Sequence, residues 1–203
     1  MNEIKVPILI SAKKLLSDAA HLNPGPWVNH SKYVALAAKN IAKKCNNIDE
    51  HIAYTAGLLH DIGRRYGVSH LQHIFDGYNF LSELGYPFLA QIALTHSFPI
   101  KEVSSYFGKM DCSKKDLVFL KKYLRDVKYS PYDELIQLCD ALALPSGFCL
   151  LEKRMVDVFL RHGPTAFMRE KWLKTFEIKD KFEKQMGVSI YKVLPGVIRS
   201  TFV

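Results

Sequence analysis

The chain has 203 residues, of which 48% are hydrophobic and 24% are charged, so a disordered chain is excluded and one globular domain over residues 1–203 is expected. Lys and Arg number 28 against 20 Asp and Glu, which gives a formal net charge of +8. This charge favours anionic partners such as phosphates, although it is also a common means of keeping a protein soluble.

Helical periodicity runs through the whole chain, whereas the alternation typical of strands is weak. Apolar spacing, together with Pro, Gly and capping signals, predicts helices at about 8–22, 28–44, 49–62, 70–84, 87–97, 113–125, 130–144, 149–162, 164–186 and 189–200. Ser69 and Gln72 form a capping-box pattern at the start of the fourth helix. Residues 98–112 have no regular pattern, and there is no internal repeat. The expected fold class is therefore all-α, a single helical bundle.

The four cysteines contain no Cys-x-x-Cys pair, which excludes a zinc knuckle, a thioredoxin-type motif and a disulfide scaffold. We interpret them as reduced core thiols of a cytoplasmic protein. No stretch approaches the roughly 18 apolar residues of a membrane helix. Residues 1–10 also lack the apolar run of a signal peptide. No membrane partner is expected.

Five titratable side chains interrupt the apolar stripes of the predicted helices, each four residues from a small or apolar residue on the same face. They are His30, His60, His73, His96 and Asp140, and Asp61 directly follows His60. A single histidine of this kind is usually a hydrogen-bonded core or surface residue. For the whole set a metal site is the better interpretation, because a buried carboxylate needs a charge or a metal. Imidazoles and carboxylates together suit Fe, Mn, Zn, Co or Ni.

Residues 57–64, GLLHDIGR, resemble the motif of the HD superfamily of metal-dependent phosphohydrolases, in which a His-Asp pair ends an apolar helix and is followed by Ile-Gly and a basic residue. An upstream His30 and a downstream Asp140 extend the resemblance over about 27–161. The family fold is an all-α bundle, which agrees with the helical pattern. Residues from about 162–203 would then form a C-terminal helical extension.

The resemblance implies that His30, His60, Asp61 and Asp140 bind one metal ion. Some family members hold a second ion with two further histidines, and His73 and His96 match that arrangement. Asp61 would then bridge the two ions. The implied cofactor is one or two divalent transition-metal ions per chain, chosen among Fe, Mn, Co, Ni and Zn.

The resemblance also implies the reaction, which is hydrolysis of a small phosphate ester by a metal-activated water next to Asp61. A nucleotide or a dinucleoside polyphosphate is the expected substrate. Arg64 and Arg65 follow the His-Asp pair, and guanidinium groups bind phosphate oxygens. Both are therefore predicted to bind substrate and Arg64 to act in catalysis, the alternative being solvated surface charges. Gly63 either allows close backbone approach near the metal or only ends the helix.

Two other functions remain open from the sequence. Some proteins of HD type use a similar ligand set as di-iron oxygenases, and the ligands alone do not separate the two chemistries. A non-catalytic regulatory module that binds a nucleotide or a metal is the third possibility, although it has no need of all six ligands. The basic stretches belong to no nucleic-acid-binding module, so nucleic acid is not an expected partner. The oligomeric state is left open.

The tripeptide Gly85-Tyr86-Pro87 matches the name-giving sequence of the HD-GYP group, which cleaves cyclic dinucleotides. Here it precedes His96 instead of following a histidine pair, and we interpret it as a loop between two helices. The remaining histidines and the tryptophans take structural interpretations, namely the surface or a helix end for His21, His51, His70 and His162, and the core for Trp27 and Trp172.

Overall fold

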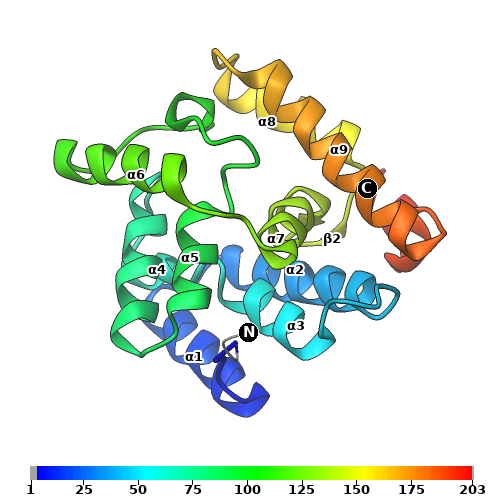
Figure 1. The fold of residues 1–203 in the computed structure, drawn as a ribbon, viewed down its shortest axis with the longest axis horizontal. Helices are drawn as coiled ribbons and strands as arrows, with labels where there is room; N and C mark the ends of the chain where they lie inside the picture. Colours follow the sequence, from blue (N-terminus) through cyan, green and yellow to red (C-terminus); the bar gives the residue numbers. More distant parts are fainter. Residues whose placement is uncertain (1–3, 203) are drawn as a thin grey trace.

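The computed structural model describes residues 4–202 and shows a bundle of α-helices with one very short hairpin. The middle of the bundle is made by α2 (Trp27–Ala42), α3 (Glu50–Leu59) and α7 (Pro131–Leu142), and α1 (Leu9–Leu22) packs against α3 (Figure 1). Buried aliphatic residues from all four helices form one continuous core. The all-α prediction is therefore confirmed.

A pair of antiparallel helices stands beside this centre. It consists of α4 (Gln72–Glu83) and α5 (Pro87–Thr95), and α4 also packs against a 3-10 helix, η1 (Ile62–Tyr66). The Gly85-Tyr86-Pro87 segment is the predicted loop between them. Gly85 adopts a φ of 76°, a conformation that glycine tolerates without strain, and Pro87 begins α5.

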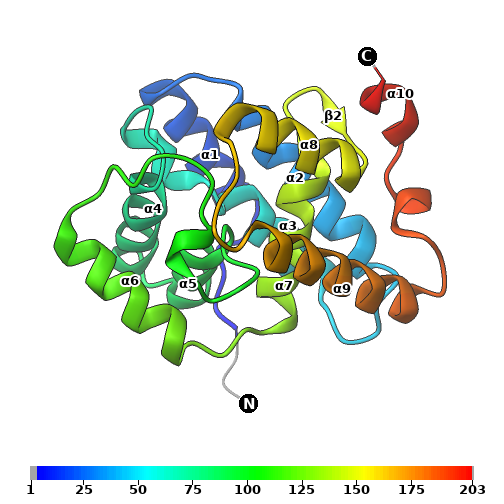
Figure 2. The same ribbon diagram turned by 90° about the horizontal axis from the view of Figure 1, so that it is seen from above.

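The C-terminal helices cover the side of α7 that faces away from α2 and α3 (Figures 1 and 2). They are α8 (Leu151–His162) and α9 (Met168–Met186), while α6 (Lys114–Asp126) lies near α4 and α5. Ile178 and Phe182 of α9 are buried in the main core. The remaining elements are short: η2 (Val103–Ser105), β1 (Ala143–Leu144), β2 (Gly147–Phe148), η3 (Ile190–Val193) and α10 (Val197–Thr201).

Three of the predicted helices differ clearly in extent, and the helix expected over 164–186 begins only at Met168. The helix expected over 49–62 ends at Leu59, and the chain continues as the 3-10 helix Ile62–Tyr66, whose tighter turn lets it contact α4. The helix expected over 189–200 is two short pieces, η3 and α10. Pro195, which has no N–H to donate, and Gly196, with a φ of 74°, separate them.

The capping box predicted for Ser69 and Gln72 is also wrong, because α4 begins at Gln72 and its flanking residue offers no side-chain cap. The carboxylate of Asp111, in the irregular segment before α6, caps the helix instead. It accepts hydrogen bonds from the main-chain nitrogens of His70 at 2.7 Å and of Gln72 at 2.9 Å. Partial burial opposes ionisation, yet these two donors hold the pKa of Asp111 below its usual value.

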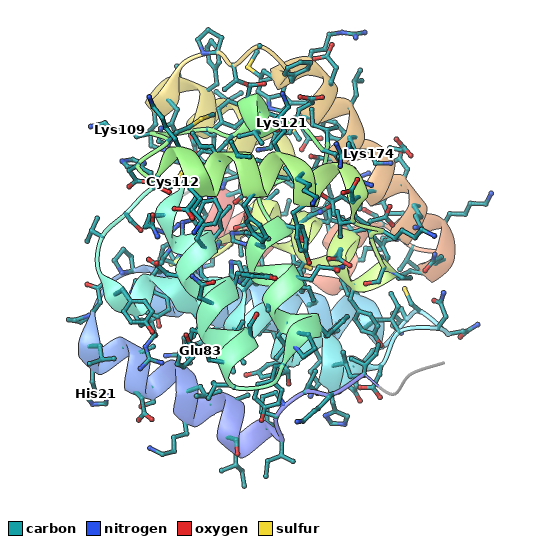
Figure 3. All side chains as sticks on the ribbon, turned by 60° about the vertical axis from the view of Figure 1, so that its left-hand side comes forward. His21, Glu83, Lys109, Cys112, Lys121 and Lys174 are labelled. Carbon is teal, nitrogen blue, oxygen red and sulfur yellow. The ribbon has the colours of Figure 1, made fainter. Side chains whose placement is uncertain are left out.

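The surface assignments made from the sequence agree in part with the structure. His21 and His51 are exposed, and His21 lies on the outer side of α1 (Figure 3). Of the four cysteines three are buried and Cys112 is half-buried, and none of them is paired in a disulfide. Within residues 4–202 no helix is both long enough and apolar enough to cross a membrane.

The substitution Asp111→Ala should lower the free energy of unfolding by about 1 kcal/mol, the usual contribution of a helix N-cap, because two main-chain N–H groups lose their acceptor. Urea unfolding followed by circular dichroism measures this change. Asp126→Ala is the matched control, since Asp126 pairs with the exposed Arg125 and such surface pairs contribute little. Equal losses in the two variants would contradict the capping role.

Candidate metal centre

The six side chains that the sequence singled out converge on one centre. Each stands on the inner face of a helix or directly after its last turn. They are His30 in α2, His60 and Asp61 after α3, His73 in α4, His96 after α5 and Asp140 in α7. The four histidines and Asp61 are buried, and Asp140 is partly buried.

Two glycines let the main chains of these elements touch. A Cβ atom on Gly57 would lie 2.7 Å from the Cα of Ala35, so α3 rests directly on α2. A Cβ atom on Gly63 would lie 2.0 Å from the carbonyl oxygen of His73 and 2.4 Å from the amide nitrogen of Gly77. The close backbone approach, one of the two interpretations of Gly63, is therefore confirmed. It places the His-Asp pair against the first turn of α4.

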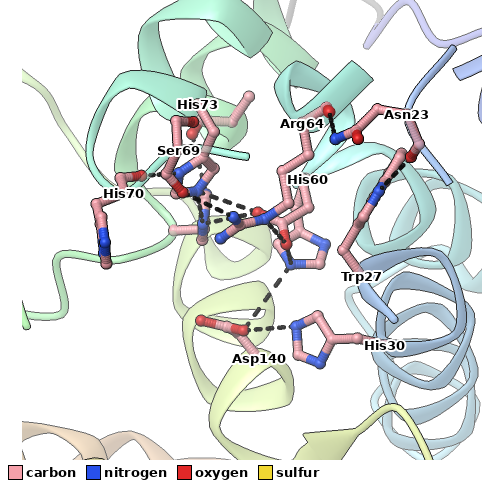
Figure 4. Close-up of polar contacts among 12 residues, drawn as sticks. Asn23, Trp27, His30, His60, Arg64, Ser69, His70, His73 and Asp140 are labelled. Atoms are coloured by element: carbon pink, nitrogen blue, oxygen red, sulfur yellow. Dashed lines mark hydrogen bonds and ion pairs between the residues drawn. The ribbon is translucent and has the colours of Figure 1, made fainter. Parts of the chain in front are cut away.

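The first ligand group joins α2, α3 and α7. His30 Nε2 lies 2.9 Å from Asp140 Oδ1, and His60 Nε2 lies 3.9 Å from both Asp140 Oδ1 and Asp61 Oδ2 (Figure 4). One ligand atom each from His30, His60 and Asp61 fits within 4.8 Å of the others. The separations of 3.9 Å are longer than hydrogen bonds and suit atoms around a common cation, whereas His30 and Asp140 are hydrogen-bonded to each other.

The second ligand group uses the same carboxylate. Asp61 Oδ1 lies 3.1 Å from His73 Nε2 and 3.6 Å from His96 Nε2. The two Nε2 atoms are 3.4 Å apart. Asp61, His73 and His96 again fit within 4.8 Å of one another. Asp61 is thus the residue that the two groups share, with one oxygen near each.

The tautomers of three histidines follow from their main-chain contacts. His60 Nδ1 lies 2.7 Å from the carbonyl oxygen of Gly57, His96 Nδ1 lies 2.9 Å from that of Ala93, and His73 Nδ1 contacts that of His70. A carbonyl oxygen only accepts hydrogen bonds, so each Nδ1 carries the proton. In the neutral rings each Nε2 then presents a lone pair to the centre, as metal-binding histidines with an oriented second nitrogen do.

Burial makes this arrangement unfavourable without a cation. His60 Nε2 and Asp61 Oδ1 are buried and have no hydrogen-bond partner. The lone pairs of His73 and His96 face each other across 3.4 Å. An orphaned buried carboxylate oxygen is costly. The donor set therefore fits divalent transition-metal ions, for which imidazole nitrogen and carboxylate oxygen are suitable ligands.

The ionisation states also suit metal binding. Burial lowers the pKa of His60 and lowers that of His96 to about 3, so both rings are neutral ligands at neutral pH. Burial opposes ionisation of Asp61, but the neighbouring Arg64 guanidinium and the histidines hold the pKa of that carboxyl well below its usual range. Burial likewise opposes ionisation of Asp140, whose pKa is nevertheless lowered, with His30 as its closest partner.

The two arginines that follow the His-Asp pair are placed differently. Arg64 lines the cavity above the centre, and its Nε donates to Asp61 Oδ2 at 2.7 Å while its Nη1 donates to the carbonyl oxygen of Ser69 at 3.2 Å. Arg65 is not brought to the centre. Its guanidinium carbon lies 4.0 Å from the ring centroid of Phe80 in α4, which is a cation–π contact. Of these two arginines, only Arg64 lines the cavity.

A cavity of about 530 Å³ opens over the centre. Its wall includes residues that the sequence interpretation gave to the surface or the core, namely His70, His162, Trp27 and Trp172. The carbonyl group of His70, rather than its ring, serves the centre, because it orients His73. Trp172 is half-buried on the cavity wall and not in the core.

Sequence reasoning missed Lys171 of α9. Its Nζ lies in the cavity wall and donates to the carbonyl oxygens of Ser97 at 2.9 Å and of Ser105 at 3.2 Å. These bonds tie α9 to the segment that follows His96. Burial lowers the pKa of Lys171 to about 8. In a helix rich in lysine, no sequence pattern distinguishes this residue from its solvated neighbours.

Comparison with known proteins finds one family. The model of the HD domain matches residues 27–144, which is more than half of the chain and contains all six side chains of the centre. Comparison with curated proteins and with solved structures gives no match.

The contact at Gly63 should be intolerant of any side chain. Gly63→Ala is expected to lower the free energy of unfolding by about 3 kcal/mol or more, because the methyl group would overlap the main chain of α4, which cannot yield as a flexible side chain can. Urea unfolding measures it. Gly77→Ala is the control in the same contact. Its Cβ would come no closer than 3.1 Å, to the side chain of Ala93, so a loss as large as that of Gly63→Ala would refute the argument.

Proposed function

Because this chain belongs to the HD domain family of metal-dependent phosphohydrolases, we propose that it hydrolyses a small phosphate ester at a centre of two divalent transition-metal ions. The observation that carries the proposal is the position of Asp61. Its two oxygens lie near two separate sets of Nε2 lone pairs. A single carboxylate shared in this way is what a bridge between two cations requires.

The ligands divide between the ions as the geometry suggests. His30, His60 and Asp140 would hold one ion, and His73 and His96 the other, with Asp61 common to both. When bound, the two ions would acidify a water molecule and offset the negative charge of the phosphoryl group. Main-chain carbonyl groups fix the tautomers and the orientation of His60, His73 and His96, so these three side chains need little rearrangement to bind an ion.

Arg64 is the residue that we propose to bind the phosphoryl oxygens. Its guanidinium uses two of its five N–H groups on Asp61 and Ser69. The remaining donors belong to a group that lines the cavity. The same side chain therefore holds the bridging carboxylate in place and offers charge-assisted hydrogen bonds to the substrate.

The size of the cavity favours a small substrate. A volume of about 530 Å³ lies within the usual range for small-molecule sites. A nucleotide is the substrate class we favour, and a dinucleoside polyphosphate would extend beyond the cavity into solvent. The alternative is oxygen chemistry at a di-iron form of the same centre. Measurements of phosphate release and of oxygen uptake must separate it from hydrolysis.

We expect about two transition-metal ions per chain in protein purified without oxygen and without a metal-binding tag, measured by elemental analysis. His96→Ala should lose one of them, since it removes a ligand of the second group only. Asp61→Ala should lose both ions or most of both, together with phosphate release. The loss of both ions in Asp61→Ala follows from the position of Asp61, which the two ligand groups share.

The exposed His51 provides the control, and His51→Ala should keep the full metal content. A content of one ion per chain in both the wild-type protein and His96→Ala would reduce the centre to one ion, and two ions in both would remove His96 from the ligand set. Full metal and turnover in Asp61→Ala would show that the assignment of the centre is wrong. Oxygen uptake with substrate and without phosphate release would favour the oxygenase.

Arg64→Gln should reduce kcat/KM for phosphate release by about 100-fold, the usual effect of removing one donor from a developing negative charge. Metal content, measured on the same samples, reports whether Asp61 has kept its place. The neighbouring Arg65→Gln removes the same charge from a residue outside the cavity. It should change kcat/KM by less than about threefold, and a loss equal to that of Arg64→Gln would indicate a general charge effect.

A further inference from the structure

The cavity has a second wall that takes no part in the metal centre. Its residues come from α8 and α9 and include Arg154, Val158, Arg161, Lys171 and Trp172. All of them follow residue 144, where the match to the HD domain ends. This wall is therefore a feature that the chain adds to the shared family core, at the place where the distal part of a substrate would lie.

Two arginines face the cavity from one side of α8. Arg154 and Arg161 are seven residues apart, which is two helical turns, so their side chains leave the same face. Both line the cavity. In the part of the chain that the structure describes, no carboxylate comes within ion-pair distance of either guanidinium. Asp157 lies between them but offers Arg161 Nε only its carbonyl oxygen, at 3.3 Å.

Further cationic or protonatable groups crowd the same wall. His162 follows Arg161, and its ring centroid lies 6.4 Å from that of His70. Burial lowers the pKa of His162, and Arg161, His70 and Arg154 lower it further. Burial and the nearby Arg154 also lower the pKa of Arg161. Arg161 and His162 thus lie close to other cationic or protonatable groups, and Asp157 only partly offsets their effect on the pKa of Arg161.

Negative charge in the cavity is confined to the metal centre. Among the described residues that line the cavity, the only carboxylates are Asp61 and Asp140. Both would be occupied by metal ions. A cavity with metal ions at one end and unpaired guanidinium groups at the other fits a ligand that is anionic at both ends.

We propose that the α8–α9 wall is a second anion-binding subsite, formed by Arg154 and Arg161, which takes a phosphate or carboxylate group on the part of the substrate remote from the metal centre. The proposal rests on the proposed function, because it assumes that the metal ions and Arg64 hold the first phosphate. It narrows the substrate class to phosphate esters that carry a second, separate anionic group. Guanidinium groups suit both phosphate and carboxylate through paired N–H donors.

Calorimetric titration with three phosphonates tests the subsite, since phosphonates are not consumed by hydrolysis. The ligands are benzylphosphonate, 4-(phosphonomethyl)benzoate and 1,4-xylylenediphosphonate, added under nitrogen to the metal-loaded protein. We expect at least one of the doubly anionic ligands to bind about 10-fold more tightly than benzylphosphonate. The two doubly anionic ligands tell whether the subsite prefers carboxylate or phosphonate.

The double variant Arg154→Gln/Arg161→Gln should bind all three ligands with affinities within about twofold of one another. The matched control is Lys153→Gln/Arg169→Gln, which removes one positive charge from α8 and one from α9 at positions outside the cavity. It should keep the 10-fold preference. Circular dichroism and metal analysis of each variant report that the fold and the centre are intact, as expected for side chains that are at least partly exposed.

Three results would overturn the subsite. The first is that the wild-type protein binds the doubly anionic ligands no more tightly than benzylphosphonate. The second is that the arginine variant keeps the preference for the doubly anionic ligands. The third is that the control variant loses this preference as fully as the arginine variant, which would attribute the preference to net charge. Phosphate release from simple esters without any preference would reject the subsite and leave the proposed function standing. A preference that depends on the arginines, with no phosphate ester hydrolysed, would reject the function and keep the subsite. Failure to bind any of the three ligands would reject both.

Discussion

A desolvated carboxylate surrounded by imidazole lone pairs is the constraint on which the rest of this structure depends. Asp61 is buried, and one of its oxygens has no hydrogen-bond partner. Three histidines are fixed through Nδ1 to main-chain carbonyl groups and turn their unprotonated nitrogens inward. Such an arrangement is unstable in a dry interior unless a cation completes it. The main-chain contact at Gly63 and the ion pair with Arg64 hold that carboxylate in position.

Five of the six candidate ligands could be predicted from the sequence because each interrupts the apolar stripe of a helix, and Asp61 because it directly follows His60. A titratable residue on an apolar stripe is conspicuous, and the His-Asp pair followed by Ile-Gly-basic is specific. Helical periodicity does not predict in which direction a side chain points once the helix has ended. Arg64 and Arg65 could therefore both be predicted to bind substrate, with only the family motif favouring Arg64, whereas the 3-10 helix η1 places Arg64 at the cavity and Arg65 against Phe80.

Contacts between distant segments were beyond the reach of the sequence. The cap on α4 comes from Asp111, and a local Ser-x-x-Gln pattern suggested a different one. Lys171 joins α9 to the segment after His96 across more than 60 residues. Both interactions depend on where an irregular segment lies, and no periodicity describes such a segment. The C-terminal helices for the same reason could be predicted as helices but not as a wall of the cavity.

Under the proposed function, the charges of the two walls would link the binding of metal ions to the binding of substrate. Four cationic side chains, Arg64, Arg154, Arg161 and Lys171, line the cavity against the two carboxylates Asp61 and Asp140. Divalent ions entering this field meet repulsion that grows with each ion bound, because the dielectric constant of a partly enclosed cavity is below that of water. An anionic ligand removes that repulsion. The proposed metal ions and a doubly anionic substrate would then strengthen each other's binding by the same factor, as reciprocity of linked equilibria requires. The excess of basic residues in the chain thereby contributes to the site itself, since unpaired cationic side chains lie where the second anionic group of the proposed substrate would be held.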